Sequence, residues 1–260
     1  MSFAGRYGPW ALVVGASEGI GAEYVRLLAQ RGLDLVLVSL PQDPLDDVVR
    51  SAEAAGRTCV PVSGDVGHAA TLDAVSDACN DKDVGLLVVN AAQSEVGAVL
   101  ETDEDVLVSQ IRVNCEAALR LVRRLAPAMV ERGHGGVVLT SSLSSVAASP
   151  WLATYAATKS FLLRFGESVA EELRPTGVDV TVLMPGPVDT PGFRSSSLAG
   201  GPAPISAAVA ASAALDALGR RTVVVPGGAR MVAQRVLLQR LLPARVANRI
   251  MATALRRMYR

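Results

Sequence analysis

Lysine, cysteine and histidine are all scarce in this sequence of 260 residues. Of its 25 lysine and arginine residues, only Lys82 and Lys159 are lysines. The three cysteines lie far apart, with no CxxC spacing and no neighbouring histidine, which excludes a disulfide framework and a zinc site. We therefore expect a protein of a reducing compartment without a bound metal.

The sequence also lacks an excess of either charge and any long apolar run. Its 25 acidic residues balance its 25 basic ones, which argues against a nucleic-acid-binding protein. No apolar run approaches the roughly 18 residues of a membrane-spanning helix, and the first run, WALVV, is too short for a signal peptide. These absences predict a cytoplasmic protein.

Short apolar runs rich in Val and Leu are present, and helical patterns separate them. The runs are continuous, as is typical of parallel strands covered on both faces. This alternation predicts an α/β fold, a Rossmann-type doubly wound parallel sheet of about seven strands with helices on both faces. The expected strands span 10–14, 34–39, 58–62, 85–90, 136–142, 178–185 and 222–226. The expected helices span 19–31, 44–55, 69–80, 103–132, 152–173 and 206–219.

A glycine-rich loop follows the first expected strand directly. Gly15, Gly19 and Gly21 form a G-x-x-x-G-x-G pattern that opens a helix. Glycines let the backbone turn tightly and approach a pyrophosphate, which binds at the free N–H groups of a helix N-terminus. A tight strand-to-helix turn also uses glycines, but the position after the first strand of a βαβ unit favours a nucleotide site.

A second pattern brings together a phenol, an ammonium group and a hydroxyl. Tyr155 and Lys159 are four residues apart in YAATK, so both leave the same face of a helix. Ser142 ends the strand that precedes this helix, and strand ends line the ligand crevice of a doubly wound sheet. We expect the ammonium group to lower the pKa of the phenol, which makes it a better proton-transfer group. A surface pair on a helix is the alternative for any such spacing.

Together these motifs resemble the short-chain dehydrogenase/reductase family, over about residues 8–226. Val14 stands where the family usually has Thr, and Asn90 to Gln93 only partly match its N-N-A-G motif. The resemblance implies four catalytic residues: Asn114, Ser142, Tyr155 and Lys159. It implies cofactor contacts at Gly15, Ser17, Glu18, Gly19, Ile20, Gly21, Ser39, Asp65, Val66, Asn90, Ala91, Ala92, Tyr155, Lys159, Pro185, Gly186, Val188 and Thr190.

The family likeness implies an NAD(P)-dependent oxidoreductase that transfers hydride between a carbonyl and a secondary alcohol. Tyr155 would move the proton, Ser142 would stabilise the substrate oxygen, Lys159 would hold the ribose, and Asn114 would anchor a water. A dinucleotide-binding regulator without catalysis is the alternative, although no member of the tetrad is missing. Apolar residues near the site favour a lipophilic substrate such as a ketoacyl, steroid or aromatic ketone. These residues are Leu143, Val146, Pro150, Trp151, Leu152, Phe193 and Leu198.

The cofactor could be NAD(H) or NADP(H), and the charges favour NAD(H). Ser39 and Leu40 replace the acidic and basic residues that discriminate between the two in relatives. A 2′-phosphate prefers cations, yet Asp43 follows this strand and Glu18 lies in the glycine loop.

Residues 1–228 are expected to form one dinucleotide-binding and catalytic domain, and 229–260 a basic helical extension divided at Pro243. The segment 190–206, rich in Gly, Pro and Ser, is expected to close over the site as a lid. The resemblance implies a homodimer or homotetramer through the helices 103–132 and 152–173.

The C-terminal extension is unusual in charge. No acidic residue follows Asp216, whereas ten arginines lie between Arg220 and Arg260. Its apolar residues follow helical spacing, which predicts amphipathic helices. We favour packing of this apolar stripe on the subunit or across a dimer over contact with a membrane surface. The stripe consists of Val232, Val236, Leu237, Leu241, Val246, Ile250 and Leu255.

Overall fold

The computed structural model describes residues 1–195 and 203–258. Its central sheet confirms the predicted architecture: seven parallel strands in the order β3-β2-β1-β4-β5-β6-β9. The strand order reverses direction between β1 and β4, which in such sheets opens a crevice at the carboxyl ends of the strands. The strands are β1 Trp10–Val14, β2 Asp34–Ser39, β3 Cys59–Ser63, β4 Val84–Val89, β5 Gly135–Thr140, β6 Val178–Leu183 and β9 Val223–Val224.

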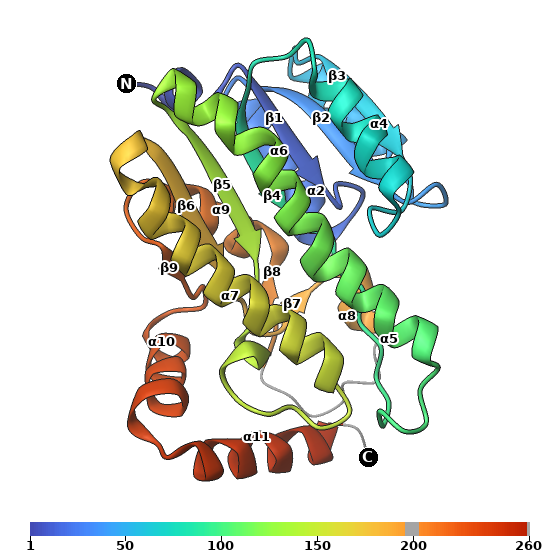
Figure 1. The fold of residues 1–260 in the computed structure, drawn as a ribbon, viewed down its shortest axis with the longest axis vertical. Helices are drawn as coiled ribbons and strands as arrows, with labels where there is room; N and C mark the ends of the chain where they lie inside the picture. The colour runs from blue at the N-terminus through green and yellow to red at the C-terminus, as the bar shows by residue number, and fades with distance from the viewer. Residues whose placement is uncertain (196–202, 259–260) are drawn as a thin grey trace.

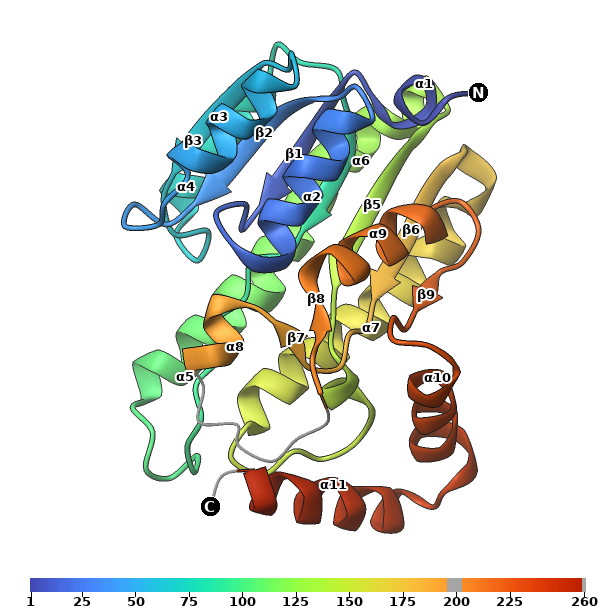
Figure 2. The ribbon, with the colours of Figure 1, turned by 180° about the vertical axis from the view of Figure 1, so that it is seen from behind.

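Helices cover both faces of the sheet, and two hydrophobic cores result. Ala11 and Val13 of β1 face one core, whereas Leu12 and Val14 face the other. This explains why the strand sequences carry apolar residues at consecutive positions instead of alternating with polar ones. Figure 1 shows α4 (Ala69–Cys79), α6 (Ala117–Arg132) and α7 (Ala153–Leu173) over one face. Figure 2 shows α2 (Gly19–Gln30), α3 (Asp46–Ala54) and α9 (Ala207–Ala217) over the other.

Several boundaries differ from the sequence-based expectation. The long helix expected over 103–132 is divided into α5 (Glu104–Ile111), a π-helical turn η1 (Arg112–Glu116) and α6. Strand β5 ends at Thr140, so Ser142 lies in the following turn, at the start of the short helix η2 (Leu143–Val146). A short helix α1 (Phe3–Tyr7) precedes β1, which no sequence pattern indicated.

The expected lid segment contains structure on both sides of residues 196–202, which lie outside the described residues. It begins with α8 (Pro191–Ser195), and a small sheet pairs β7 (Val188–Asp189) with β8 (Ile205–Ser206). This pairing holds the two ends of the segment together beside the carboxyl end of the main sheet. Leu198, expected to line the substrate site, also lies outside the described residues.

The C-terminal extension forms α10 (Ala229–Val236), the π-helical turn η4 (Leu237–Leu241) and α11 (Ala244–Met258). In both ribbon views α11 forms the lower end of the molecule, beyond the carboxyl ends of the strands (Figures 1 and 2). Met231 of α10 packs into a third core that contains Leu143, Leu163 and Met184. None of the helices built from the described residues has the length and apolar character needed to span a bilayer.

Candidate active site

The glycine loop is packed too closely for side chains at two of its three glycines. Gly15 has φ +79°, and a Cβ there would lie 2.6 Å from the backbone of Ala91. A Cβ on Gly21 would overlap the carbonyl oxygen of Gly15. Asn90 donates a hydrogen bond from Nδ2 to that same oxygen at 3.1 Å. The predicted contacts Gly15, Gly21, Asn90 and Ala91 therefore form one compact unit where β1 and β4 end.

Thr190 lies on the other side of the glycine loop. Gly19 has φ +55°, and a Cβ on it would lie 2.8 Å from Cγ2 of Thr190. Val188, two residues earlier in β7, is buried. Glu18 is exposed at the N-cap of α2 and makes no capping hydrogen bond with its side chain, so the first N–H groups of this helix are not capped by it. The loop thus offers an uncapped helix N-terminus bordered by Thr190, the geometry that binds phosphates.

The remaining predicted cofactor contacts lie along the ends of β2, β3 and β6. Ser39 is buried, and its carbonyl oxygen accepts a hydrogen bond from Gly64 N at 2.9 Å. Asp65 accepts from Gly67 N through Oδ1 at 2.8 Å, which fixes the turn after β3. Pro185 accepts from Leu143 N at 2.9 Å. Of the others, Val66 is buried, Ile20 and Gly186 are half-buried, and Ala92 is exposed.

Ser17 reveals a contact that the motif did not indicate. This buried serine in the glycine loop donates from Oγ to Oδ2 of Asp43 at 3.0 Å. Asp43 lies in the loop after β2, beyond the position that usually discriminates between cofactors. The hydrogen bond places a carboxylate directly beside the glycine loop.

Ser142 and Tyr155 lie together at the end of β5. Ser142 is the N-cap of η2, and its Oγ accepts a hydrogen bond from Ser144 N at 3.2 Å. Burial raises the pKa of Tyr155 above its ordinary value, and a hydrogen bond from the Ser142 side chain acts in the opposite direction. The expected lowering of the Tyr155 pKa by Lys159 is therefore wrong in this structure, because burial outweighs the other effects.

Lys159 is one of the largest fully buried side chains of the protein. Its Nζ donates to the carbonyl oxygen of Thr140 at 2.8 Å and lies 5.5 Å from the ring centroid of Tyr155. Burial lowers the pKa of Lys159 to about 8, while the nearby Cys115 opposes this shift. The ammonium group is thus held against the end of β5, close enough to a phenol and a strand end to face a ligand in the crevice.

The side chain of Asn114 connects two segments of the site through three hydrogen bonds. In the π-helical turn η1, its Oδ1 accepts from Gln93 N at 2.8 Å. Its Nδ2 donates to Gln93 O and to Thr158 Oγ1, both at 2.9 Å. The wide π turn, a feature often found at functional sites, points this side chain between the end of β4 and helix α7. The water-holding role of Asn114 stays a prediction.

The structure also separates Ser142 from its serine neighbours. Ser141 is buried and donates from Oγ to the carbonyl oxygen of Lys159 at 2.7 Å, which fixes α7 against β5. Ser145 donates to the carbonyl oxygen of Ser142 at 2.6 Å. Sequence reasoning missed the supporting roles of Gln93 and Thr158. Gln93 bonds to Asn114 through its backbone N and O, so its side chain offered no signal for this role.

The segment between Ser142 and Tyr155 contacts both the loop that contains Gly97 and the C-terminal extension. Trp151 has φ +64°, which is uncommon for a bulky residue and marks a site of local strain. Its carbonyl oxygen accepts from Gly97 N at 2.9 Å, and Arg256 lies 5.9 Å from its ring centroid. Leu143 belongs to the third core, so only part of the predicted apolar lining is free to meet a substrate.

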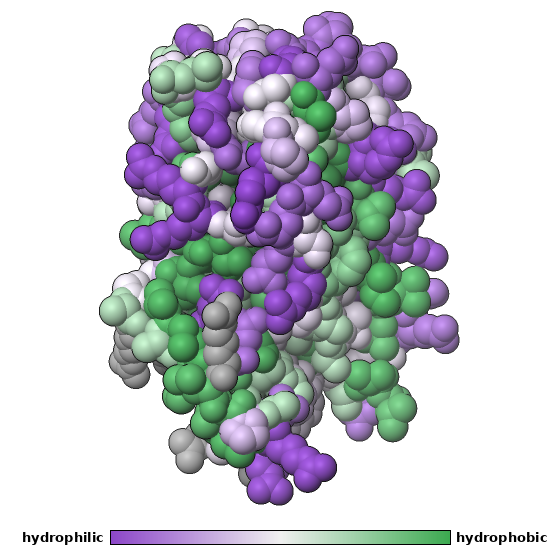
Figure 3. Space-filling model, turned by 60° about the vertical axis from the view of Figure 1, so that its left-hand side comes forward, coloured by the Kyte–Doolittle hydropathy of each residue, from purple (hydrophilic) through white to green (hydrophobic). Residues whose placement is uncertain are grey.

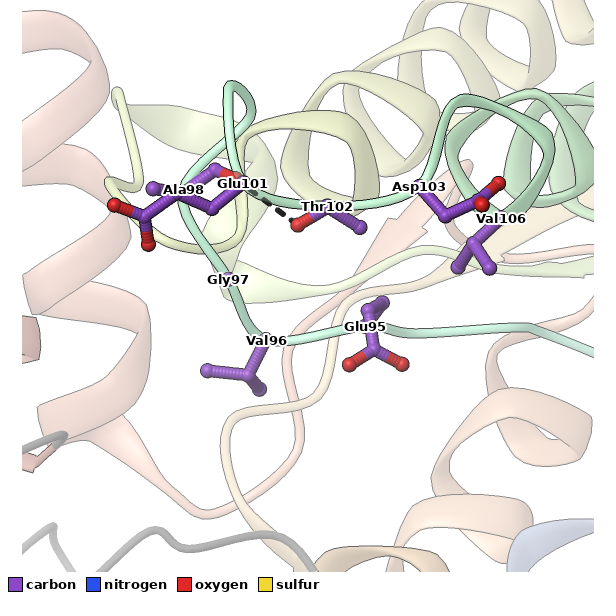
Figure 4. A pocket seen from close by; sticks show the side chains of 8 residues that line it. All are labelled: Glu95, Val96, Gly97, Ala98, Glu101, Thr102, Asp103 and Val106. Atoms are coloured by element: carbon purple, nitrogen blue, oxygen red, sulfur yellow. Dashed lines mark hydrogen bonds between the residues drawn. The ribbon is translucent and has the colours of Figure 1, made fainter.

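A cavity of about 460 Å³ is lined by the loop that contains Gly97 and by the start of α5, and neither Ser142 nor Tyr155 is among its lining residues (Figure 4). Thr102 donates to the carbonyl oxygen of Ala98 at 3.0 Å and closes one side of it. The lining is acidic rather than lipophilic, so we do not assign the ketone site to it. It is lined by Glu95, Val96, Gly97, Ala98, Glu101, Thr102, Asp103 and Val106.

Comparison with known proteins places this arrangement in a family. The family model for short chain dehydrogenases matches residues 9–199, so the chain belongs to the short-chain dehydrogenase family. It is 32% identical over 188 residues to the very-long-chain 3-oxoacyl-CoA reductase of Neurospora crassa, covering 69% of this chain and 56% of that protein. It is 30% identical over 192 residues to the 7beta-hydroxysteroid dehydrogenase of Clostridium sardiniense, covering 74% of each.

Solved structures extend the likeness beyond the family model. A structure from a study of 7beta-hydroxysteroid dehydrogenase stereoselectivity matches with a TM-score of 0.89 and 26% identity, over 96% of this chain and 99% of that one. A short-chain dehydrogenase from Sphingobium yanoikuyae in complex with NADPH matches with a TM-score of 0.79 and 28% identity, over 91% and 98%. The chain spans only about half the length of the oxoacyl-CoA reductases that it matches.

Proposed function

We propose that the protein is an NAD(P)-dependent oxidoreductase that interconverts a carbonyl and a secondary alcohol. The observation that carries this proposal is the convergence of Ser142, Tyr155 and Lys159 at the end of β5, beside the glycine loop. A regulator that only binds dinucleotide would not need these three groups together. The close approach of Ala91 to Gly15 and the uncapped start of α2 fit a pyrophosphate.

Each polar group has a defined task in this reaction. A nicotinamide dinucleotide supplies or accepts the hydride when it is bound. In the reducing direction Tyr155 gives its proton to the substrate oxygen, and its raised pKa keeps it protonated at neutral pH. Ser142 donates a hydrogen bond to the same oxygen as negative charge develops. Lys159 holds a ribose hydroxyl, and Asn114 keeps η1 and α7 in register.

The cofactor proposed is NAD(H) rather than NADP(H). Support comes from Asp43, whose carboxylate is held beside the glycine loop by Ser17 and would repel a 2′-phosphate. Fluorescence titration of both reduced cofactors tests the choice. A dissociation constant for NADPH well below that for NADH would reject it.

A lipophilic ketone is the proposed substrate, of the ketoacyl, steroid or aromatic type. The relatives named above are an oxoacyl-CoA reductase and a hydroxysteroid dehydrogenase. The apolar residues Val146, Trp151 and Leu152 lie in the segment between Ser142 and Tyr155. We further propose a cytoplasmic homodimer or homotetramer. Ile111, Leu119 and Phe161 are exposed on the helices through which the family resemblance implies pairing.

The substitution Tyr155→Phe tests the proposal, because it removes the proton donor and keeps the ring. On a substrate found by screening steroid, acyl-thioester and aromatic ketones, we expect kcat to fall about a hundredfold or more. Cofactor affinity should remain near that of the wild type. Tyr7→Phe is the matched control, since Tyr7 donates its hydroxyl to Asp179 far from the site. Retained turnover in Tyr155→Phe, or activity only on hydrophilic sugars, would refute the mechanism or the substrate class.

A further inference from the structure

The C-terminal extension packs on the subunit, but not through the apolar stripe that the sequence predicts. Leu238, Ala247 and Leu255 are its buried residues, and only Leu255 belongs to that stripe. Asn248 accepts a hydrogen bond from Ala148 N at 3.0 Å, and Arg235 forms an ion pair with Glu167 at 3.8 Å. The subunit therefore covers one side of the extension but not most of the predicted stripe, and packing of the stripe across a dimer stays a prediction.

The other residues of the stripe point to solvent. We call them the tail surface; each is between 39% and 68% exposed, and they provide six of the sixteen large hydrophobic side chains that are exposed in the described part of the chain. Figure 3 shows hydrophobic side chains gathered over the lower part of the molecule, where α10 and α11 lie. Exposed apolar clusters of this kind mark interaction sites. The tail surface consists of Val232, Val236, Leu237, Leu241, Val246 and Ile250.

Exposed arginines of α11 lie in the same segment as the tail surface. No acidic residue follows Asp216 in the sequence. Arg245, Arg249 and Arg256 are exposed, and within residues 1–195 and 203–258 none of them has an acidic partner within salt-bridge distance. A symmetric contact with a second copy would bring two such arginine-rich faces together, which like-charge repulsion opposes. A nucleic acid would satisfy the arginines but leave the valines and leucines uncovered.

We propose that the tail surface docks on an anionic phospholipid membrane. The apolar side chains would enter the interface between headgroups and acyl chains, and the arginines would meet the lipid phosphates, as in other peripheral amphipathic helices. Charge complementarity selects this partner, because it offers apolar contact and negative charge on one surface. The protein remains peripheral, since only one side of α10 and α11 is available.

Docking in this way would also orient the catalytic crevice. Helix α11 is tied to the segment between Ser142 and Tyr155 through the Ala148 hydrogen bond and the contact of Arg256 with Trp151. The mouth of the crevice would therefore lie near the bilayer, where lipophilic molecules concentrate. The docking itself does not depend on the proposed activity and is tested without it.

Co-sedimentation of the full-length protein with vesicles tests the proposal. We expect binding to phosphatidylcholine vesicles that contain phosphatidylglycerol, weak binding to phosphatidylcholine alone, and release as salt rises. Arg245→Gln and Arg249→Gln should each weaken binding about fivefold, and Leu241→Glu about tenfold. Val209→Glu is the matched control, because Val209 is 47% exposed on α9, outside both the tail surface and the proposed pairing helices, and should leave binding unchanged.

Three outcomes would overturn the proposal. The first is absence of binding to anionic vesicles at low salt. The second is equal loss of binding in Val209→Glu, which would indicate non-specific association. The third is a change of oligomeric state in Leu241→Glu on sedimentation without lipid, which would assign the tail surface to a second copy. Weaker binding in Arg245→Gln, Arg249→Gln and Leu241→Glu but not in the control, with the oligomeric state constant, supports docking on the membrane.

Discussion

The carboxyl edge of the sheet and the C-terminal extension both combine apolar helices with isolated polar groups, but they are constrained in opposite ways. At the sheet edge the polar side chains of Asn114 and Lys159 have protein partners, whereas the buried Oγ of Ser144 has none. In the extension, Arg245 and Arg249 are exposed beside uncovered apolar side chains. A site that must hold atoms in fixed positions satisfies its own groups, whereas a surface that meets a partner leaves them available.

Gly21→Ala should have the largest effect on the structure at the carboxyl edge of the sheet. A Cβ there would overlap the carbonyl oxygen of Gly15, so the turn between β1 and α2 would have to open. We expect loss of measurable cofactor binding and a decrease of about 3 kcal/mol in the free energy of unfolding, as for overpacked cores. Fluorescence titration and urea unfolding measure the two effects.

Gly56→Ala is the control for this prediction. Gly56 also has a positive φ, of +76°, but a Cβ on it would meet nothing within 4 Å. The strain alone should cost about 1 kcal/mol and leave cofactor binding intact. If Gly21→Ala bound cofactor as tightly as Gly56→Ala, the close packing of the glycine loop would not matter for binding.

The same contrast explains what the sequence could predict. Each strand is marked by an apolar run, and Gly15 to Gly21, Ser142, Tyr155 and Lys159 follow local spacing, so topology alone brings them to one edge. The π turn at Asn114 was missed because Gln93 and Thr158 stabilise it from distant segments. Helical spacing found the apolar stripe of the extension but could not tell which side faces the protein. That side is set by the third core, which receives Met231.

The buried ammonium group of Lys159 should make the free energy of unfolding depend on pH. Its pKa is lowered to about 8 by burial, whereas in the unfolded chain it stays near 10.5. Between these values the unfolded state binds more protons than the folded state, so this residue makes stability rise with pH. Below about pH 8 its full burial penalty is present.

The measurement compares urea unfolding of the wild type with Lys159→Met between pH 8 and pH 10. The difference removes contributions that do not depend on Lys159, such as those of Cys59 and Cys79. We expect the free energy of unfolding of the wild type to rise relative to that of the variant by at most about 1.4 kcal/mol per pH unit. Parallel curves would mean that Lys159 keeps an ordinary pKa in the folded protein.

The smallest effect is expected at Leu241 of the extension, which lies three residues after Leu238. Leu238 is buried against the subunit, while Leu241 is 68% exposed. Leu238→Ala should therefore lower the free energy of unfolding by about 2 kcal/mol, the low end for a buried leucine, because it leaves a cavity at the edge of the domain. Leu241→Ala should change it by less than about 0.5 kcal/mol, since its side chain is already in water. Urea unfolding of both variants at one protein concentration gives the comparison. Similar costs for the two would show that Leu241 is covered in solution, by a second copy or by the protein itself, and the tail surface would then not be free to meet a membrane.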